Sequence, residues 1–198
     1  MKSRTLLMGG IFAVGVSIFA DETPAPPAGH DPAAHASGLK RELFAGITEA
    51  DFLKLGDKPK TAKVTLVAAF TDTNYGMNFN GFSHGRATYT IPVGWTVEVT
   101  FINPSPVPHS ALVVERDAVK KLQVGEPAFK GASVPKPLTG MSMSRAAFTF
   151  VASEAGDYAF CCGFPAHAIG GHWVALDVSA DAKTPTLKLG DGAAKEAK

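Results

Sequence analysis

The sequence predicts an all-β sandwich of the Greek-key type. Several short segments are rich in β-branched and aromatic residues and end at Gly, Pro, Asn or Asp, which is typical of strands joined by turns. In residues 96–101 hydrophobic and polar residues alternate, as in a strand with one buried face. Helix signals are sparse, which favours a sandwich. The predicted strands are residues 63–70, 87–91, 96–102, 110–115, 146–151, 156–162 and 173–178.

Two other elements accompany these strands. Thr48 can cap a short helix that runs through Leu55, with Asp51 three residues on in place of the usual Glu or Gln. Residues 116–145 are long and poor in strand pattern, and loops of that length are usually functional or disordered. We therefore expect a sandwich with one long loop and one short N-terminal helix.

The chain of 198 residues is expected to form one domain between two tails. Its first 20 residues combine a positive start, an apolar run and a small residue at Ala20, which predicts a secretory signal and export to the periplasm or cell exterior. An uncleaved signal would tether the protein, but the mature domain shows no transmembrane span. The predicted organisation is a signal peptide at 1–20, a Pro/Ala-rich linker at 21–38, the folded domain at 39–180 and a flexible tail at 181–198.

The distribution of charged residues argues against nucleic-acid and membrane partners and against an enzyme. The formal net charge is +1, and lysines and acids are interspersed, so neither nucleic acid nor an anionic membrane is an expected partner. Carboxylates are scattered, and no Ser-His-acid or paired-carboxylate pattern is visible. We therefore do not expect an enzyme.

Residues 160–173 hold most of the candidate metal ligands. Cys162, His167 and His172 follow a Cys-x4-His-x4-His spacing in a turn between two predicted strands. Glycines and a proline in this turn would let the chain fold all three side chains around one ion. His109 would come from the edge of a neighbouring strand and complete a site of four residues.

Strand alternation distinguishes the two adjacent cysteines. Tyr158, Phe160 and Cys162 share one face, and the aromatic residues predict that this face is the core. Cys161 lies on the other face and is expected to be a buried, inert thiol. A disulfide between neighbours would be strained and would crosslink nothing distant.

The donor set indicates copper. Two imidazoles and a thiolate with a weak axial ligand are typical of copper electron-transfer sites. Zinc accepts the same donors, but the paired Cys-x2-Cys spacing of zinc modules is missing. Met141 and Met143 could bind cuprous ion, although covering one end of the sandwich is the commoner role. Histidines outside the spacing are interpreted as solvated: His30, His35 and His84.

Six motifs occur in order along the chain, at residues 78–81, 91–95, 101–103, 108–110, 162–168 and 171–173. They resemble those of the sulfocyanins, which are cupredoxins related to rusticyanin, and the match runs from about residue 64 to 178. The resemblance implies an extracytoplasmic β-sandwich that holds one copper ion through His109, Cys162 and His167. It also implies transfer of single electrons in a respiratory chain, with redox partner proteins of the cytochrome or oxidase type. We expect a monomer.

The chain departs from the family pattern at two positions. His172 stands where the pattern carries an axial methionine, and Ala166 replaces the glycine of Pro-Gly-His. Imidazole is a harder and stronger donor than a thioether and favours cupric ion, so ligation by His172 would lower the reduction potential. Two alternatives remain open: a copper-binding or delivery protein, and a centre that binds a small molecule, as resemblance to the red copper protein nitrosocyanin would suggest.

Overall fold

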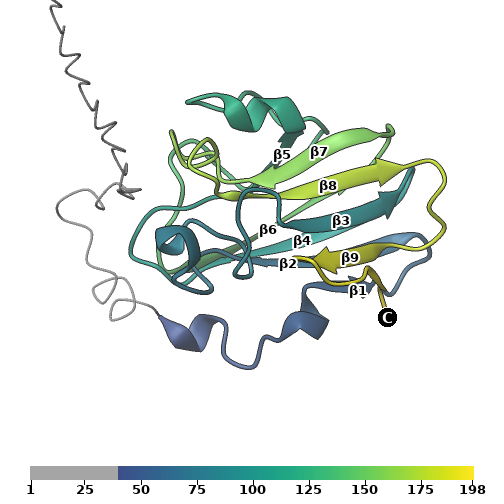
Figure 1. Cartoon of the computed structure of the whole chain (residues 1–198), viewed down its shortest axis with the longest axis horizontal. Helices are drawn as coiled ribbons and strands as arrows, with labels where there is room; N and C mark the ends of the chain where they lie inside the picture. The colour runs from purple at the N-terminus through teal and green to yellow at the C-terminus, as the bar shows by residue number, and fades with distance from the viewer. Residues whose placement is uncertain (1–39) are drawn as a thin grey trace, which may run out of the picture. The chain divides into compact units, whose positions relative to one another are not determined.

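The structure is a computed structural model that describes residues 40–198, so the predicted signal peptide and linker lie outside the described residues. It contains two sheets, with strand orders β1-β2-β4-β6 and β10-β9-β3-β8-β7-β5 (Figure 1). No helix in this range is long and apolar enough to span a membrane. The strands are β1 Leu53–Leu55, β2 Thr61–Val67, β3 Ala87–Pro92, β4 Thr96–Asn103, β5 Leu112–Glu115, β6 Ser144–Val151, β7 Gly156–Cys161, β8 Trp173–Ser179, β9 Thr186–Leu189 and β10 Lys195–Glu196.

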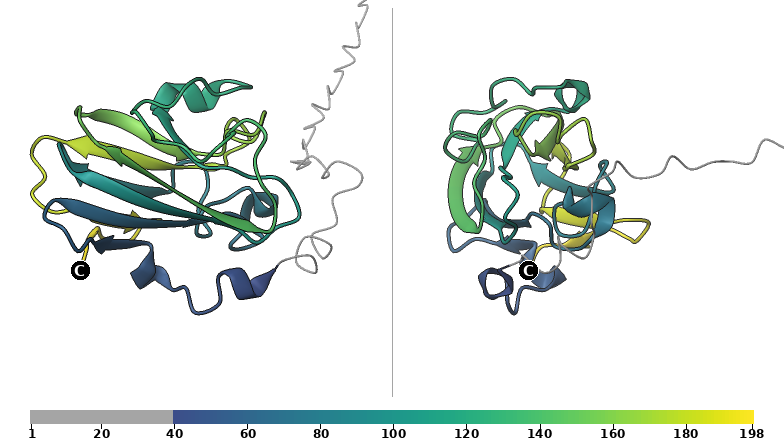
Figure 2. Two further views of the ribbon diagram at one scale, coloured as in Figure 1. Left: turned by 180° about the vertical axis from the view of Figure 1, so that it is seen from behind. Right: turned by 90° about the vertical axis from the view of Figure 1, so that its left-hand side faces the viewer.

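From β2 to β7 the chain changes sheet at each successive strand. β2 and β4 are parallel neighbours in one sheet, whereas β3, which lies between them in sequence, pairs in parallel with β8 in the other. The remaining pairs are antiparallel. Figure 2 shows the same two sheets from two further directions. The predicted β-sandwich is confirmed, and each predicted strand is present as one of β2 to β8.

The core lies between the inner faces of the two sheets. In β4, Val97, Val99 and Phe101 are buried, as the alternation predicts. Phe160 of β7 meets Tyr89 of β3 edge to face at 5.5 Å between ring centroids. Because Cys162 belongs to this same buried cluster, the prediction that it faces the core is confirmed.

The segment between β5 and β6 is the expected long loop, and it is anchored to the sheets. It begins with the 3-10 helix η4 (Arg116–Lys120). Arg116 donates to Asp177 of β8 at 2.5 Å and to the Tyr158 carbonyl at 3.1 Å. Five hydrophobic residues along the segment are buried: Val119, Val124, Phe129, Ala132 and Val134. This packing places its far end, near Met141, beside His109.

The N-terminal helix is shorter than the sequence predicts. The capping box between Thr48 and Asp51 forms, but the helix is a single 3-10 turn, η2 (Glu49–Asp51). Leu53 to Leu55, expected to be helical, instead form β1 and pair with β2. Pairing buries Leu53, which is 6% exposed, against the core. Tertiary burial therefore overrides the local helix signal.

The predicted flexible tail also differs from the structure. β9 (Thr186–Leu189) pairs with β3 on one side and with β10 on the other. Leu187 is 7% exposed and belongs to the core cluster. The composition of Lys, Ala, Gly and acidic residues around β9 obscures a strand of only four residues. The folded domain therefore extends beyond residue 180.

We predict that Leu187→Ala destabilises the protein by about 2 kcal/mol, because it removes buried methyl groups from the core. Lys188→Ala is the matched control: it alters the neighbouring exposed residue of β9 and should change stability by less than about 0.5 kcal/mol. Urea unfolding measures both. Equal effects of the two variants would contradict a strand with one buried face.

Candidate metal centre

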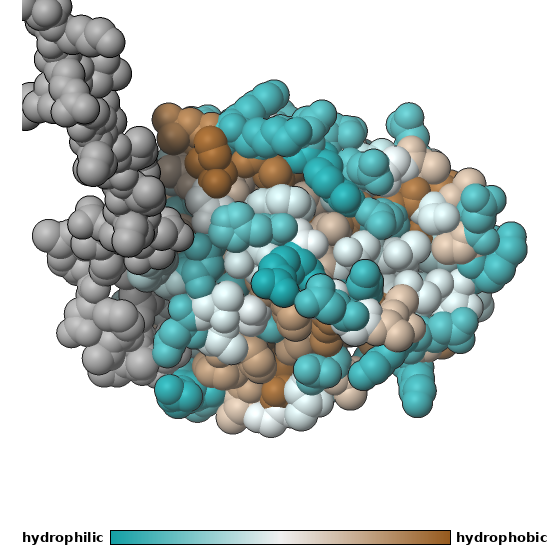
Figure 3. All heavy atoms as spheres, viewed as in Figure 1, coloured by the Kyte–Doolittle hydropathy of each residue, from teal (hydrophilic) through white to brown (hydrophobic). Residues whose placement is uncertain are grey.

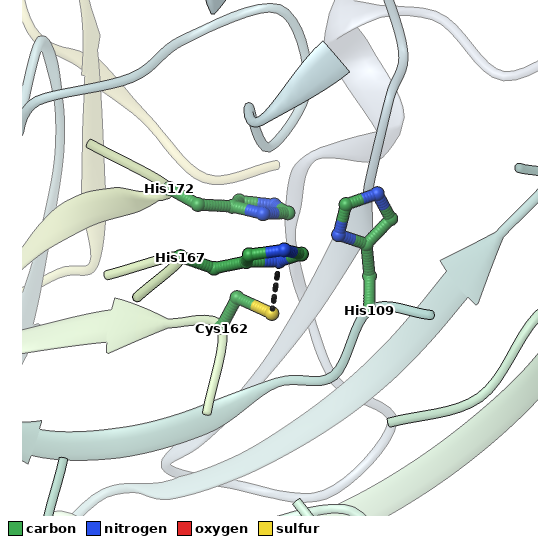
Figure 4. Close-up of side chains that lie close together, drawn as sticks. All are labelled: His109, Cys162, His167 and His172. Carbon is green, nitrogen blue, oxygen red and sulfur yellow. Dashed lines mark hydrogen bonds between the residues drawn. The ribbon is translucent and has the colours of Figure 1, made fainter. Parts of the chain in front are cut away.

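The structure brings the four predicted ligand residues together. His109 precedes β5, Cys162 follows β7, and His167 and His172 lie in the turn between β7 and β8. One ligand atom from each residue lies within 4.8 Å of those of the others. Figure 4 shows His109, on a separate segment, facing the other three side chains. Such a cluster of three imidazoles and one thiol can hold a metal ion.

His109 is held in place by the end of the long loop. Its N–H donates to the Met141 carbonyl at 3.0 Å, and the Met141 N–H donates back at 2.8 Å. Asn103, which is fully buried, reinforces this bridge: its side-chain amide donates to the carbonyls of Val107 at 2.8 Å and Met141 at 2.6 Å. Gly140 permits the close approach, because a Cβ there would lie 3.0 Å from the His109 carbonyl oxygen.

The Cys162 sulfur is surrounded by polar groups although it is buried. The Ser110 N–H donates to Sγ at 3.3 Å, and His167 Nδ1 lies 3.5 Å from Sγ. Burial raises the pKa of the Cys162 thiol, while the backbone N–H groups of Ser110 and Phe164 oppose that rise. These donors favour the thiolate, which is the form that binds a metal.

The β7–β8 turn is closed by its own backbone. The His172 N–H donates to the His167 carbonyl at 2.9 Å, and the Cys162 N–H donates to the His172 carbonyl at 3.0 Å. Gly171 has φ +96°, and a Cβ at this position would lie 2.1 Å from the His84 ring. A residue other than glycine therefore cannot occupy position 171 without displacing His84.

His172 is enclosed by hydrophobic and ligand side chains. It is fully buried, its ring centroid is 4.4 Å from that of Phe79, and within the described residues neither ring nitrogen has a hydrogen-bond partner of good geometry. Burial lowers its pKa well below the usual value, with further lowering by His109 and His167, whereas the nearby Asn78 backbone weakly opposes the shift. A buried, neutral imidazole without hydrogen bonds costs about 1–3 kcal/mol. A metal ion would satisfy such a nitrogen, so the residues fit a metal.

His167 is the only one of the four that is not fully buried. Its ring packs against Phe164 at 4.7 Å and against His109 at 5.1 Å between centroids. Burial lowers the pKa of His167, which favours the neutral ring that a metal requires. This histidine therefore connects the buried cluster to the molecular surface.

The remaining candidates lie outside the cluster. Cys161 is fully buried in a small second hydrophobic cluster, and burial, followed by the neighbouring Cys162, raises its pKa well above the usual value. It is the buried thiol that strand alternation predicts. His84 is exposed, as expected of a turn histidine. Met141 is half-buried beside His109, and Met143 is 42% exposed.

Residue-type patterns did not identify two supporting residues, Asn103 and Ser110. Ser110 links the ligand segments: its Oγ accepts a hydrogen bond from the Gly163 N–H at 2.8 Å and lies 3.8 Å from the Cys162 sulfur. A signal was nevertheless available, because both residues fall within the motifs on which the resemblance rests, around residues 101–103 and 108–110.

We predict that Ser110→Ala destabilises the metal-free protein by about 1–2 kcal/mol, because it leaves the buried Gly163 N–H without its acceptor. Ser142→Ala serves as the control, since Ser142 is exposed at the same end of the structure and does not belong to the cluster. Thermal unfolding compares the two variants. If Ser110→Ala lost no more thermal stability than Ser142→Ala, the role of Ser110 as acceptor for the Gly163 N–H would be contradicted.

Comparison with known proteins identifies relatives of the chain. Residues 49–188 match the model of the Sulfocyanin (SoxE) domain. Sulfocyanin of Sulfolobus acidocaldarius is 30% identical over 137 residues, which are 64% of this chain and 67% of the relative.

Solved structures with similar folds include two copper proteins. Rusticyanin from Thiobacillus ferrooxidans is 22% identical, with a TM-score of 0.39, and the alignment covers 66% of this chain and 89% of that one. Auracyanin A, a "blue" copper protein from Chloroflexus aurantiacus, is 19% identical, with a TM-score of 0.40 and coverage of 60% and 99%. The domain match, which spans most of the chain, and the relative at 30% identity show that the chain belongs to the sulfocyanin family of cupredoxins.

Proposed function

We propose that this protein is a single-electron carrier that binds one copper ion through His109, Cys162, His167 and His172. The observation that carries the proposal is the convergence of four ligand atoms within 4.8 Å; among residues 40–198, both nitrogens of buried His172 lack hydrogen-bond partners of good geometry. Bound copper would supply a one-electron couple. Cupredoxins are electron carriers rather than enzymes, which agrees with the function proposed for this member of the family.

Family membership favours copper over zinc. The donor set alone suits both ions, because zinc also accepts thiolate and imidazole. The sulfocyanin domain covers residues 49–188 and therefore includes all four proposed ligands. Thiolate and imidazole donors stabilise both copper oxidation states, as an electron carrier requires. The backbone N–H and carbonyl groups of His109 and His172 are all hydrogen-bonded. We therefore expect little movement of these ligands when the electron is transferred.

The exposed edge of His167 is the proposed route for electrons. Around it Pro165 and Ala166 are exposed, Ile169 is 51% exposed and Leu122 is 70% exposed. The Leu122 carbonyl accepts a hydrogen bond of 2.7 Å from Ala166, so the long loop contributes to the same surface. Figure 3 shows hydrophobic side chains over this end of the sandwich. A redox partner protein of the cytochrome or oxidase type would dock here.

Ala168, although it lies between His167 and Ile169, is not part of this surface. It is 3% exposed and packs in the second hydrophobic cluster with Cys161. Its methyl group therefore supports the turn from inside, and Ile169 next to it provides exposed hydrophobic surface.

The N-terminal sequence supports a location outside the cytoplasm. Residues 1–20 have the features of a secretory signal, and we propose export to the periplasm or cell exterior as a monomer in a respiratory chain. A retained signal would tether the same domain to a membrane surface.

Copper delivery is the second candidate function. Met143 is 42% exposed near the half-buried Met141, whose backbone pairs with His109, and thioethers bind cuprous ion well. A delivery protein would release cuprous ion readily, whereas an electron carrier would retain it. Loss of copper upon reduction therefore distinguishes the two functions.

The proposed ligand set is tested by removing each cysteine in turn. Cys162→Ala should abolish the copper-thiolate absorption band, because it removes the only thiolate in the cluster. Cys161→Ala should retain the band, since Cys161 lies in a separate hydrophobic cluster. Visible absorption after addition of cupric ion measures both variants. Loss of the band in Cys161→Ala but not in Cys162→Ala would show that Cys161, and not Cys162, is the copper ligand.

We also predict that His172→Met raises the reduction potential, because a thioether stabilises cupric ion less than an imidazole does. The absorption bands should shift toward those of a blue centre. Redox titration followed by absorption measures both properties in one sample. An unchanged potential in a variant that keeps its copper-thiolate band would show that His172 does not bind the metal.

A further inference from the structure

A segment distant in sequence forms the outer wall of the turn that carries His172. Residues 73–85 include the 3-10 helix η3 (Thr73–Gly76) and Phe79, whose ring lies 4.4 Å from that of His172. The His84 N–H donates to the Gly171 carbonyl at 2.8 Å. This wall therefore contacts both the backbone of the turn and the His172 ring.

Asn74 makes the side-chain link between this wall and the turn. Its amide Nδ2 donates to the Gly170 carbonyl at 2.8 Å and to the Met77 carbonyl at 3.0 Å. The Met77 methyl group also lies 3.5 Å from the position of a Cβ on Gly170. One half-buried amide therefore joins two segments separated by 96 residues.

Asn74 occupies an unfavourable backbone conformation to make this link. Asn74 has φ 51° and ψ 43°, and Tyr75 has φ 55° and ψ 36°, so two successive residues other than glycine are left-handed. Asparagine tolerates this region better than most residues, whereas tyrosine does not favour it. Strained backbone of this kind persists where surrounding contacts hold it, often beside a functional site.

The turn has a specific need for an external support. Gly170 and Gly171 directly precede His172, and glycine restricts the backbone less than any other residue. His172 is itself bonded through its N–H and carbonyl within the turn. The Gly171 carbonyl accepts from the His84 N–H of the 73–85 wall and from the Trp173 N–H, whereas the Gly170 carbonyl accepts from the Asn74 side chain. Without the Asn74 bond, the Gly170 carbonyl would lose this donor, and the bond from His84 to Gly171 would remain as the wall's hydrogen bond to the glycine pair.

We propose that Asn74 is a positioning residue for His172: by holding the Gly170 carbonyl, it keeps the glycine pair rigid and sets how firmly His172 is presented to the metal. This inference rests on the proposed copper site. Asn74 does not contact the metal ligands in this role; it acts through the backbone of the turn.

The test compares Asn74→Gly and Asn74→Ala with Thr73→Ala. Both Asn74 variants lose the hydrogen bond, but only alanine adds a penalty for the left-handed backbone, so an effect common to both reports the lost bond. Thr73→Ala is the control, because Thr73 is exposed and its hydroxyl accepts a hydrogen bond from the Thr71 hydroxyl at 3.0 Å, away from Gly170. Thermal unfolding of each variant checks that the fold is intact.

Hydrogen exchange of the metal-free proteins provides the first readout. The amides of Gly171 and His172 should exchange roughly five- to tenfold faster in both Asn74 variants, as expected for loss of one hydrogen bond. In Thr73→Ala, the amides of Gly171 and His172 should exchange at the wild-type rate. Unchanged exchange in both Asn74 variants would overturn the proposal even before copper is added.

The copper-loaded proteins provide the second readout. A loosely held His172 should bind less strongly, so the reduction potential and the electron paramagnetic resonance hyperfine splitting should shift in the same direction as in His172→Met, by a smaller amount. Faster exchange with an unchanged potential and splitting would overturn the positioning role. Absence of a copper-thiolate band in the wild-type protein would instead refute the proposed function itself.

Discussion

The contact between Ser110 and Cys162 is the interaction on which the rest of the metal centre depends. His109 and Cys162 lie on segments more than fifty residues apart, and antiparallel pairing of β5 with β7 brings those segments side by side. Ser110, next to His109, then donates its N–H to the Cys162 sulfur and accepts from Gly163. A small shift between β5 and β7 would separate the thiol from His109. The sandwich therefore determines the cluster through strand register.

The same arrangement makes the metal-free site energetically unfavourable. His109, His172 and Cys162 are each almost completely buried, and hydrophobic residues such as Phe79 lie against them. Desolvation opposes both the Cys162 thiolate and the charged His172 imidazole. A bound metal would favour the thiolate and satisfy the buried nitrogens of His172. Rigid walls around such ligands suit an electron carrier, because the site need not rearrange when its charge changes.

The sequence predicted most of the fold and the four clustered residues for identifiable physical reasons. Strands β2 to β8 are rich in β-branched and aromatic residues, and the parity of β7 distinguished Cys162 from Cys161. β1 and β9 were not predicted because they are three and four residues long, and their burial depends on partners elsewhere in the chain. The bond from Asn74 to Gly170 has no local signal at all, since it connects left-handed backbone to a carbonyl 96 residues away. Side-chain bonds between distant loops require the folded structure.

The most direct test of the central claim is a visible absorption and electron paramagnetic resonance spectrum of the purified protein loaded with cupric ion, recorded before and after ascorbate and again after reoxidation. An electron carrier with Cys162 as a ligand should show an intense copper-thiolate band that disappears on reduction and returns fully. Hyperfine splitting would then report on the contribution of His172. A protein that shows no thiolate band, or that loses its copper on reduction, would contradict the account of this cluster as an electron-transfer centre.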